Sequence, residues 1–221
     1  MNDWYLIRHG ETQWNAERRV QGHTDVPLHD GGREQAALTG QRLADIRFGA
    51  VYASDLIRAR ETAEIIVAAS NTGPYEIVFD QRLREVSFGK LEGKTWTEMD
   101  DEIKAVQHER DLDFAPPGGE SYRRMLDRLG GFAGMLKERH PNEDVLVVGH
   151  GAAFRALAVR LLDLPDETFW SLSGLRSASI SRVRRRDDGR TALFAWSDAG
   201  HLDVQPPQTG TGILSHAHLT Q

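Results

Sequence analysis

Two short apolar segments of the chain each run into a histidine that is followed by glycine. Residues 4–7 lead into Arg8-His9-Gly10, and the valine-rich residues 144–148 lead into Gly149-His150-Gly151. A short apolar run that stops at such a turn is typical of a buried strand. In an open α/β sheet, ligands bind beyond the carboxyl ends of the strands. We therefore expect a sheet that brings both histidines to one edge.

Strand-like and helix-like segments alternate along most of the chain. Strands are expected at 4–7, 50–53, 75–79 and 144–148, and as a hairpin at 179–184 and 191–196 around Asp187-Asp188-Gly189. Helices are expected at 33–46, from a cap at Ser54-Asp55 to about 69, and at 95–110, 121–139 and 152–162. Such alternation predicts a three-layer α/β/α fold with a mostly parallel central sheet.

A single domain is expected to span residues 1–221, because no internal repeat or change of composition marks a boundary. The helical residues from about 95 to 139 are expected to cover the site. The tail from about 206 is rich in Thr, Gly and His and is expected to be poorly ordered. His216 and His218 in this tail are interpreted as solvated, since no carboxylate or thiol stands close to them in the sequence.

Charge and composition exclude several classes of partner. The net charge is −6, which argues against a nucleic-acid partner, since the phosphate backbone of such a partner is also negative. The chain has no cysteine, so disulfides, zinc–thiolate sites and cysteine nucleophiles are excluded. It shows neither a signal-peptide pattern nor a run of roughly 18 apolar residues. We therefore expect a cytoplasmic protein without a membrane partner. The sequence leaves open whether the protein forms a homodimer.

The predicted sheet edge gathers a set of side chains suited to phosphoryl transfer. Arg58 lies in the first turns of the helix after strand 50–53, and Glu85 lies on a loop after strand 75–79. Two guanidiniums match the oxygens of a phosphoryl group, and a neutral imidazole can attack phosphorus. A protonated carboxyl group can give its proton to the leaving alkoxide. This set can work without a metal.

Motifs around these residues follow one another between residues 6 and 151. They are Leu6-Ile7-Arg8-His9-Gly10-Glu11-Thr12, Ser54-Asp55-Leu56-Ile57-Arg58-Ala59, Leu83-Arg84-Glu85, Pro117-Gly118-Gly119-Glu120-Ser121 and Val147-Val148-Gly149-His150-Gly151. In this order they resemble the motifs of the histidine phosphatase superfamily, the phosphoglycerate-mutase-like proteins. Asn15 and Gln21-Gly22 resemble the segment that follows the first motif in phosphatase members. Leu91 departs from the pattern, since many relatives carry Trp there.

The resemblance implies a phosphoglycerate-mutase-like fold and a role for each matched residue. His9 would be the nucleophile that becomes phosphohistidine, and Glu85 the general acid and later the base that activates water. The phosphoryl group would be held by Arg8, Asn15, Arg58 and His150. Less directly, the pocket or its mouth would include Gln21, Gly22 and Gly151. No metal or cofactor is implied.

Two of these assignments have alternatives. Asn15 could serve only as the cap of a turn. The acid could instead be one of three other carboxylates in the same part of the sequence, Asp80, Glu92 or Glu120.

The sequence after Glu85 favours a phosphatase over a mutase. Glycolytic mutases of the superfamily typically carry Arg-His-Tyr-Gly there and further arginines in a later insertion. This chain has Val86-Ser87-Phe88-Gly89 instead, and no adjacent arginine pair between Glu92 and Pro116. We therefore expect hydrolysis of a small phosphomonoester. The alternatives are a cofactor-dependent phosphoglycerate mutase and a non-catalytic phospholigand-binding module. Candidates to line the mouth of the site are Phe88, Trp96, Phe114 and Tyr122.

Overall fold

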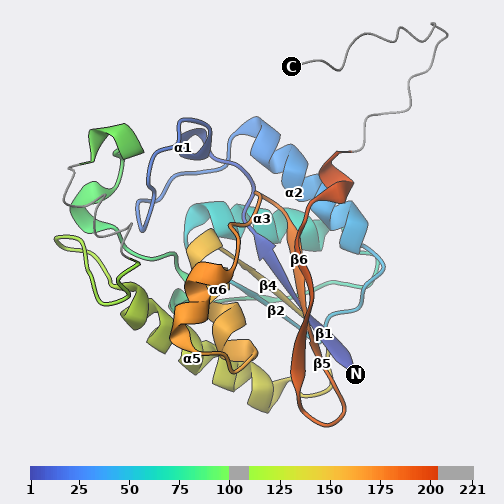
Figure 1. Cartoon of the computed structure of the whole chain (residues 1–221). Helices are drawn as coiled ribbons and strands as arrows, with labels where there is room; N and C mark the ends of the chain where they lie inside the picture. The colour runs from blue at the N-terminus through green and yellow to red at the C-terminus, as the bar shows by residue number, and fades with distance from the viewer. Residues whose placement is uncertain (100–109, 204–221) are drawn as a thin grey trace, which may run out of the picture.

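The computed structural model describes residues 1–99 and 110–203, which are built around a six-stranded sheet (Figure 1). The strand order is β3-β2-β4-β1-β5-β6. The strands are β1 (Asn2–Arg8), β2 (Ala50–Ala53), β3 (Ile77–Phe79), β4 (Val145–Gly149), β5 (Ile180–Arg185) and β6 (Thr191–Asp198). β3, β2, β4 and β1 run parallel, and β5 and β6 are antiparallel to their neighbours. The expectation of a mostly parallel sheet is confirmed.

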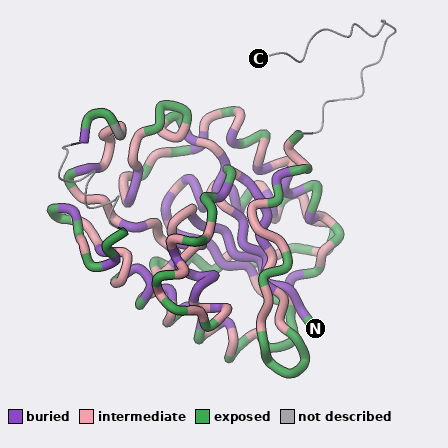
Figure 2. The backbone as a smooth tube through the Cα atoms, viewed as in Figure 1, coloured by how far each residue is buried: buried purple, intermediate pink, exposed green. Residues whose placement is uncertain are grey.

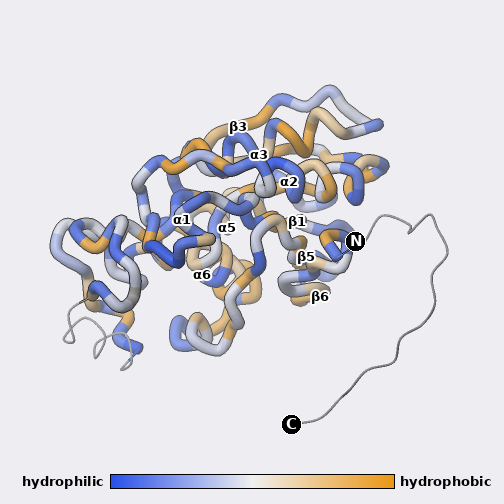
Figure 3. The backbone as a smooth tube through the Cα atoms, turned by 90° about the horizontal axis from the view of Figure 1, so that it is seen from above, coloured by the Kyte–Doolittle hydropathy of each residue, from blue (hydrophilic) through white to orange (hydrophobic). Residues whose placement is uncertain are grey.

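Helices cover both faces of this sheet. One face packs against α2 (Asp30–Leu43) and α3 (Ile57–Ala68), and the other against α5 (Tyr122–Arg139) and α6 (Gly151–Leu161). In the view from above, α2 and α3 lie on one side of β1 and α6 on the other (Figure 3). A four-residue helix, α1 (Gln13–Ala16), follows β1. The three-layer α/β/α prediction is confirmed.

The two central strands are buried on both faces, as Figure 2 shows. Along β1, Trp4 and Leu6 enter the core under α5 and α6, whereas Tyr5 and Ile7 enter the core under α2 and α3. Alternate side chains of a strand point to opposite faces, so a strand covered on both sides must be apolar throughout. This burial fixes where β1 ends, and therefore where His9 lies at the edge of the sheet.

The two helices on the α2–α3 face begin at other residues than the sequence predicts. α2 begins three residues earlier than expected, because the His29 ring nitrogen Nδ1 accepts the Gly32 N–H at 3.0 Å and caps the helix. The predicted Ser54-Asp55 cap is wrong, since α3 begins at Ile57. Arg84 binds the Asp55 carboxylate at 2.7 and 2.6 Å and so takes it away from the helix.

The region expected to cover the site is described in part. Trp96–Glu98 forms a 3₁₀ turn, and most of the helix expected at 95–110 lies outside the described residues. The helix expected at 121–139 is confirmed as α5, which packs on α6 and on the sheet. The tail from about 206 also lies outside the described residues. No helix within the described ranges is long and apolar enough to cross a bilayer.

Candidate active site

His9 stands at the carboxyl end of β1 and is almost fully buried. Its main-chain N–H donates to the Gly149 carbonyl at 2.9 Å, which ties it to the end of β4. Its ring nitrogen Nδ1 lies 2.7 Å from the Gly10 carbonyl oxygen. A carbonyl oxygen can only accept, so Nδ1 carries the proton and Nε2 keeps its lone pair. The free nitrogen Nε2 is therefore the one that can attack an electrophile.

His150 stands at the end of β4 and precedes the first residue of α6. Its Nε2 lies 2.8 Å from the Ser54 hydroxyl oxygen, which also accepts the Leu56 N–H at 3.4 Å. The Ser54 hydroxyl can donate its proton to Nε2, and in that tautomer the ring proton is on Nδ1. Nδ1 is buried and has no partner among the residues described. It is a donor available to a bound anion.

Arg8 and Arg58 bring two positive charges to the same place. Arg58 is 1% exposed, and its Nη1 and Nη2 donate to the carbonyls of Thr24 at 3.0 Å and Gly22 at 2.8 Å. Arg8 donates through Nη1 to the Leu175 carbonyl. These partners are neutral, and both Nε atoms are buried without a partner in the described part of the chain. The two guanidiniums therefore keep charge that an anion can neutralise.

The site holds both imidazoles in the neutral form. Burial lowers the pKa of His9 well below 6.5, and the charges of Arg58 and Arg8 lower it further. Burial also lowers the pKa of His150, again with Arg58 as the largest charge effect. Burial lowers the pKa of Arg58 to about 10, so that it stays a cation at neutral pH. A neutral imidazole keeps a lone pair that can attack, and the neighbouring guanidinium cations can bind a dianion.

Glu85 lies across the site at the amino end of α6. Its Oε1 accepts the N–H groups of Val86 at 3.0 Å and Ala153 at 3.1 Å, and its Oε2 accepts that of Ala152 at 3.1 Å. A methyl group built on Gly151 would lie 3.7 Å from Arg8 Nε and 3.9 Å from Glu85 Oε2. The carboxyl group is therefore next to Arg8, with Gly151 beside both.

The other candidate acids have different structural partners. The Asp80 carboxylate binds Arg82, and the Glu120 carboxylate binds Arg128. Glu92 accepts the main-chain N–H groups of His23, Thr24 and Phe88 at 2.9 to 3.1 Å. Burial would raise the pKa of Glu92, but these hydrogen bonds and one from the Thr24 hydroxyl lower it below its usual range. Of the four carboxylates, Glu85 is the one whose oxygen lies beside Arg8 and Gly151, so its position favours it as the acid.

The segment after the first motif folds as a support for Arg58. Thr12 caps α1, and Asn15 Oδ1 accepts the Thr12 N–H at 3.1 Å to complete a capping box, which agrees with the local structural role offered as the alternative for Asn15. The Thr12 hydroxyl donates to Gln21 Oε1 at 3.1 Å. Gly22 has φ +53° and presents its carbonyl to Arg58. Contact of Asn15 or Gln21 with a phosphoryl group stays a prediction.

Comparison with known proteins agrees with this arrangement. The sequence model of the histidine phosphatase superfamily (branch 1) matches residues 4–198, which is most of the chain. The chain belongs to the histidine phosphatase superfamily. The matched range includes all the residues placed in the site above.

Relatives of this chain within the superfamily carry both mutase and phosphatase names. A protein of Citrobacter koseri named probable phosphoglycerate mutase GpmB is 40% identical over 211 residues, which are 90% of this chain and 94% of the relative. The solved mycobacterial glucosyl-3-phosphoglycerate phosphatase with VO3 has a TM-score of 0.81 and 28% identity, over 90% of this chain and all of that one. Bacillus stearothermophilus YhfR has a TM-score of 0.81 and 32% identity, over 92% of this chain and all of that one.

Sequence reasoning missed the residues that hold Glu85 in place. Arg128, on α5, binds both Glu120 oxygens at 2.8 Å and donates to the carbonyls of Arg82 at 2.7 Å and Glu85 at 2.9 Å. His23 Nε2 lies 2.8 Å from the same Glu85 carbonyl. These contacts join residues far apart in the chain, so no local pattern announces them. Ser54 could have been found, because it directly follows β2.

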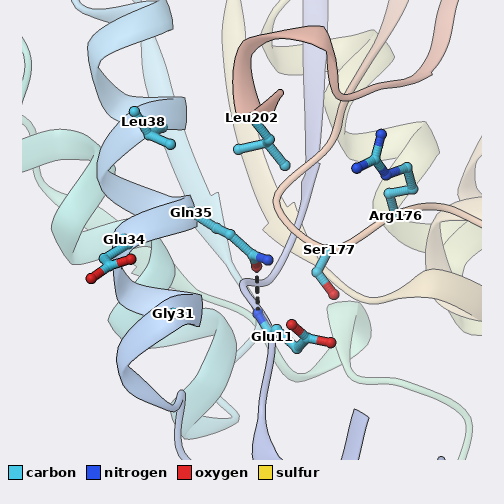
Figure 4. A pocket seen from close by; sticks show the side chains of 8 residues that line it. All are labelled: Glu11, Gly31, Glu34, Gln35, Leu38, Arg176, Ser177 and Leu202. Atoms are coloured by element: carbon cyan, nitrogen blue, oxygen red, sulfur yellow. Dashed lines mark hydrogen bonds between the residues drawn. The ribbon is translucent and has the colours of Figure 1, made fainter. Parts of the chain in front are cut away.

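A polar hollow of about 570 Å³ lies beside the first motif (Figure 4). It opens between α2, which contributes Glu34 and Gln35, and the loop of Arg176 and Ser177. Gln35 Oε1 accepts the Glu11 N–H at 3.0 Å on its floor. Neither His9 nor His150 lines the hollow, so it lies apart from the site described above. Within residues 1–99 and 110–203, no group of three or more His, Asp or Glu side chains is placed to hold a metal ion.

Proposed function

We propose that this chain is a metal-independent phosphomonoester hydrolase that acts through a phosphohistidine on His9. The observation that carries the proposal is the meeting of two neutral imidazoles with two guanidiniums that have only main-chain carbonyls as partners. Such a centre binds a phosphate dianion and stabilises the charge on its oxygens during transfer. A small phosphorylated metabolite is the proposed substrate.

The reaction proceeds in two transfers. His9 Nε2 attacks phosphorus while the bond to the ester oxygen breaks, and Glu85, protonated at this stage, gives its proton to the leaving alcohol. Arg8, Arg58 and the Nδ1–H of His150 hold the phosphoryl oxygens. A water molecule then attacks the phosphohistidine, and Glu85 takes a proton from it. Inorganic phosphate leaves, and His9 returns to the neutral ring.

Hydrolysis is favoured over mutase chemistry by the residues that follow the acid. A mutase must bind a second anionic group and return the phosphoryl group to it, and the sequence after Glu85 lacks the basic and aromatic pair typical of glycolytic mutases. The structural relatives named as phosphatases support the same choice. Assays of 3-phosphoglycerate with and without its bisphosphate cofactor test it. Cofactor-dependent isomerisation that exceeds phosphate release would overturn hydrolysis.

The phosphohistidine can be tested directly. Hydrolysis of 4-nitrophenyl phosphate should resist chelators and should fall by at least about 10³-fold in His9→Ala. Rapid quenching with ³²P-labelled substrate should trap an acid-labile, alkali-stable phosphoenzyme that His9→Ala cannot form. His29→Asn is the matched control, because asparagine keeps the α2 cap and leaves the site intact. Full activity of His9→Ala would refute the phosphohistidine on His9, whereas a wild-type protein that binds phosphate but hydrolyses no ester would favour the non-catalytic binding module.

A further inference from the structure

The peptide group between Gly10 and Glu11 connects the His9 ring to a side chain of α2. Its carbonyl, on Gly10, is the group that lies 2.7 Å from His9 Nδ1. Its N–H, on Glu11, donates to the side-chain oxygen Oε1 of Gln35 at 3.0 Å (Figure 4). A main-chain N–H can only donate, so the oxygen of the Gln35 amide faces it. Gln35 and the His9 ring are therefore bound to opposite edges of one planar unit.

The first turns of α2 bring Gln35 to this peptide. Gly32 and Gln35 are three residues apart and so share one face of the helix. A methyl group on Gly32 would overlap the Glu11 carbonyl oxygen, and one on Gly10 would overlap the Gly32 carbonyl oxygen. The two glycines therefore permit a close approach of main chain to main chain, and the longer Gln35 side chain reaches the Glu11 N–H beside them.

The peptide on the other side of Gly10 has different partners. The His9 carbonyl accepts the Ala178 N–H at 3.1 Å, and the Gly10 N–H donates to the Thr62 hydroxyl oxygen at 3.0 Å. These contacts hold the main chain as far as the Cα atom of Gly10. Glycine allows many orientations of the peptide that follows it, so the peptide between Gly10 and Glu11 needs a partner of its own. Gln35 supplies that partner.

The orientation of this peptide decides which nitrogen of His9 can react. With the Gly10 carbonyl in place, Nδ1 holds the proton and Nε2 keeps the lone pair that attacks phosphorus. The ring gains positive charge as Nε2 bonds to phosphorus, so the hydrogen bond from Nδ1–H to the carbonyl strengthens in the transition state. A hydrogen bond accepted from the N–H of a peptide also polarises the carbonyl of that peptide and makes it a better acceptor.

We propose that Gln35 is a positioning residue for His9, because it aligns and polarises the peptide whose carbonyl holds the Nδ1 proton. The inference rests on the proposed function, since it takes His9 as the nucleophile. It goes further by assigning a part in the reaction to a residue of α2 that lines the hollow beside the site.

Replacement of the Gln35 amide tests this role in the reaction. Gln35→Met keeps the length of the side chain and removes the acceptor, so kcat for 4-nitrophenyl phosphate should fall about 10-fold, the order expected for one hydrogen bond. Gln35→Glu keeps an oxygen at the same place and should recover most of this loss. The affinity of Gln35→Met for inorganic phosphate, measured by calorimetry, should stay within about twofold of the wild type, because the hydrogen bond acts on the transition state.

Gln41→Met is the matched control, since Gln41 is exposed on the same helix, and it should leave kcat unchanged. Equal losses of kcat in Gln35→Met and Gln35→Glu would show that Gln35 only supports packing and would overturn the proposal. Full activity of Gln35→Met would overturn it as well.

NMR of the free enzyme separates this inference from the proposed function, because it needs no turnover. In protein labelled with ¹⁵N in histidine, the His9 signal is identified by its loss in His9→Ala. Its Nδ1 proton should exchange with water at least about 10-fold faster in Gln35→Met than in the wild type, and Gln35→Glu should restore the slow exchange.

The outcomes of the NMR experiment are distinct. An unchanged His9 signal in Gln35→Met would overturn the inference and leave the hydrolase intact. Faster exchange in a protein that hydrolyses no ester would overturn the hydrolase and keep Gln35 as the residue that positions the ring. An unchanged signal in a protein without hydrolase activity would refute both.

Discussion

The His9 and His150 rings lie 5.2 Å apart between centroids, with their planes tilted by 59°. This spacing follows from the sheet, because β1 and β4 are adjacent parallel strands and Arg8 pairs with Gly149. The residue after each strand end therefore falls beside its counterpart. Each ring then meets the same two guanidiniums, which are among the causes that lower the pKa of both histidines.

Arg58 should control the protonation of both rings. It exerts the largest charge effect on the pKa of His9 and of His150. We expect NMR titration of labelled histidine to show both rings neutral at pH 6.5 in the free enzyme. Arg58→Gln should move both titrations to higher pH, because a nearby positive charge is lost. Rings that titrate at or above 6.5 in the wild type would contradict this account.

The same two histidines should make stability depend on pH. Their pKa is about 6.5 in the unfolded chain and lower in the folded one, so the unfolded chain binds more protons below about pH 6.5. The free energy of unfolding should then fall as the pH falls below 6.5, by about 1.4 kcal/mol for each unit of pKa difference. Urea unfolding at pH 7.5 and 5.0 measures this fall. His150→Asn should show a smaller fall, and an equal one would exclude His150 as its source.

Ser54 should act on the reaction through His150. Its hydroxyl is the hydrogen-bond partner of His150 Nε2 at 2.8 Å, and by donating to Nε2 it would keep the ring proton on Nδ1. Ser54→Ala should lower kcat/KM by about 10-fold, the order expected for one buried hydrogen bond. Ser54→Thr, which keeps the hydroxyl, should recover part of the loss. Equal losses in the two variants would point to packing instead of the hydrogen bond.

Gly22 should tolerate no side chain. It has φ +53°, and a methyl group there would lie 2.2 Å from Glu92 Oε1 and 2.9 Å from the Phe88 nitrogen. Gly22→Ala should displace the carbonyl that holds Arg58 and weaken the binding of inorganic phosphate, measured by calorimetry, by at least about 10-fold. Gly189→Ala is the control, since its φ of +81° brings similar strain but its nearest neighbour is 4.0 Å away. Equal affinity losses in both variants would refute the crowding argument.

Arg128 should be a positioning residue for Glu85. It is the link between Glu120 and the Glu85 carbonyl. Arg128→Lys cannot reproduce the planar pair of bonds, and should lower kcat about 10-fold with a smaller change in KM. In a Glu85→Ala background the same substitution should have no further effect on kcat. Additive losses would show that Arg128 acts on general stability and not through the acid.

The sequence alone predicts the centre of the site because local rules place it. An apolar run followed closely by His-Gly marks where β1 and β4 stop. Because the two strands are parallel neighbours, their carboxyl ends lie at the same edge of the sheet. Arg8, His9 and His150 are therefore found at one edge without any knowledge of side-chain contacts. The β5–β6 hairpin is predicted for a similar reason, because Asp187-Asp188-Gly189 is a typical turn sequence between two strands.

Long-range polar contacts are what the sequence could not supply. Asp55 resembles a helix cap, but Arg84 binds it from a distant loop. Asp25 accepts the Ile57 N–H at 2.6 Å and takes up the donor at the start of α3. The contacts of Arg128 with the acid loop are of the same kind. Each depends on which segments the sheet brings together, and none leaves a periodic trace in the chain.

The hydrogen bonds from Ala152 and Ala153 to Glu85 have a consequence for how the site can change over time. α6 begins directly after His150, so the same helix positions the His150 imidazole and binds the Glu85 carboxylate. A displacement of α6 shifts the imidazole and the carboxylate together and preserves the distance between them. Surrounding loops can therefore diverge to admit new alcohols while the machinery for breaking the ester keeps its alignment.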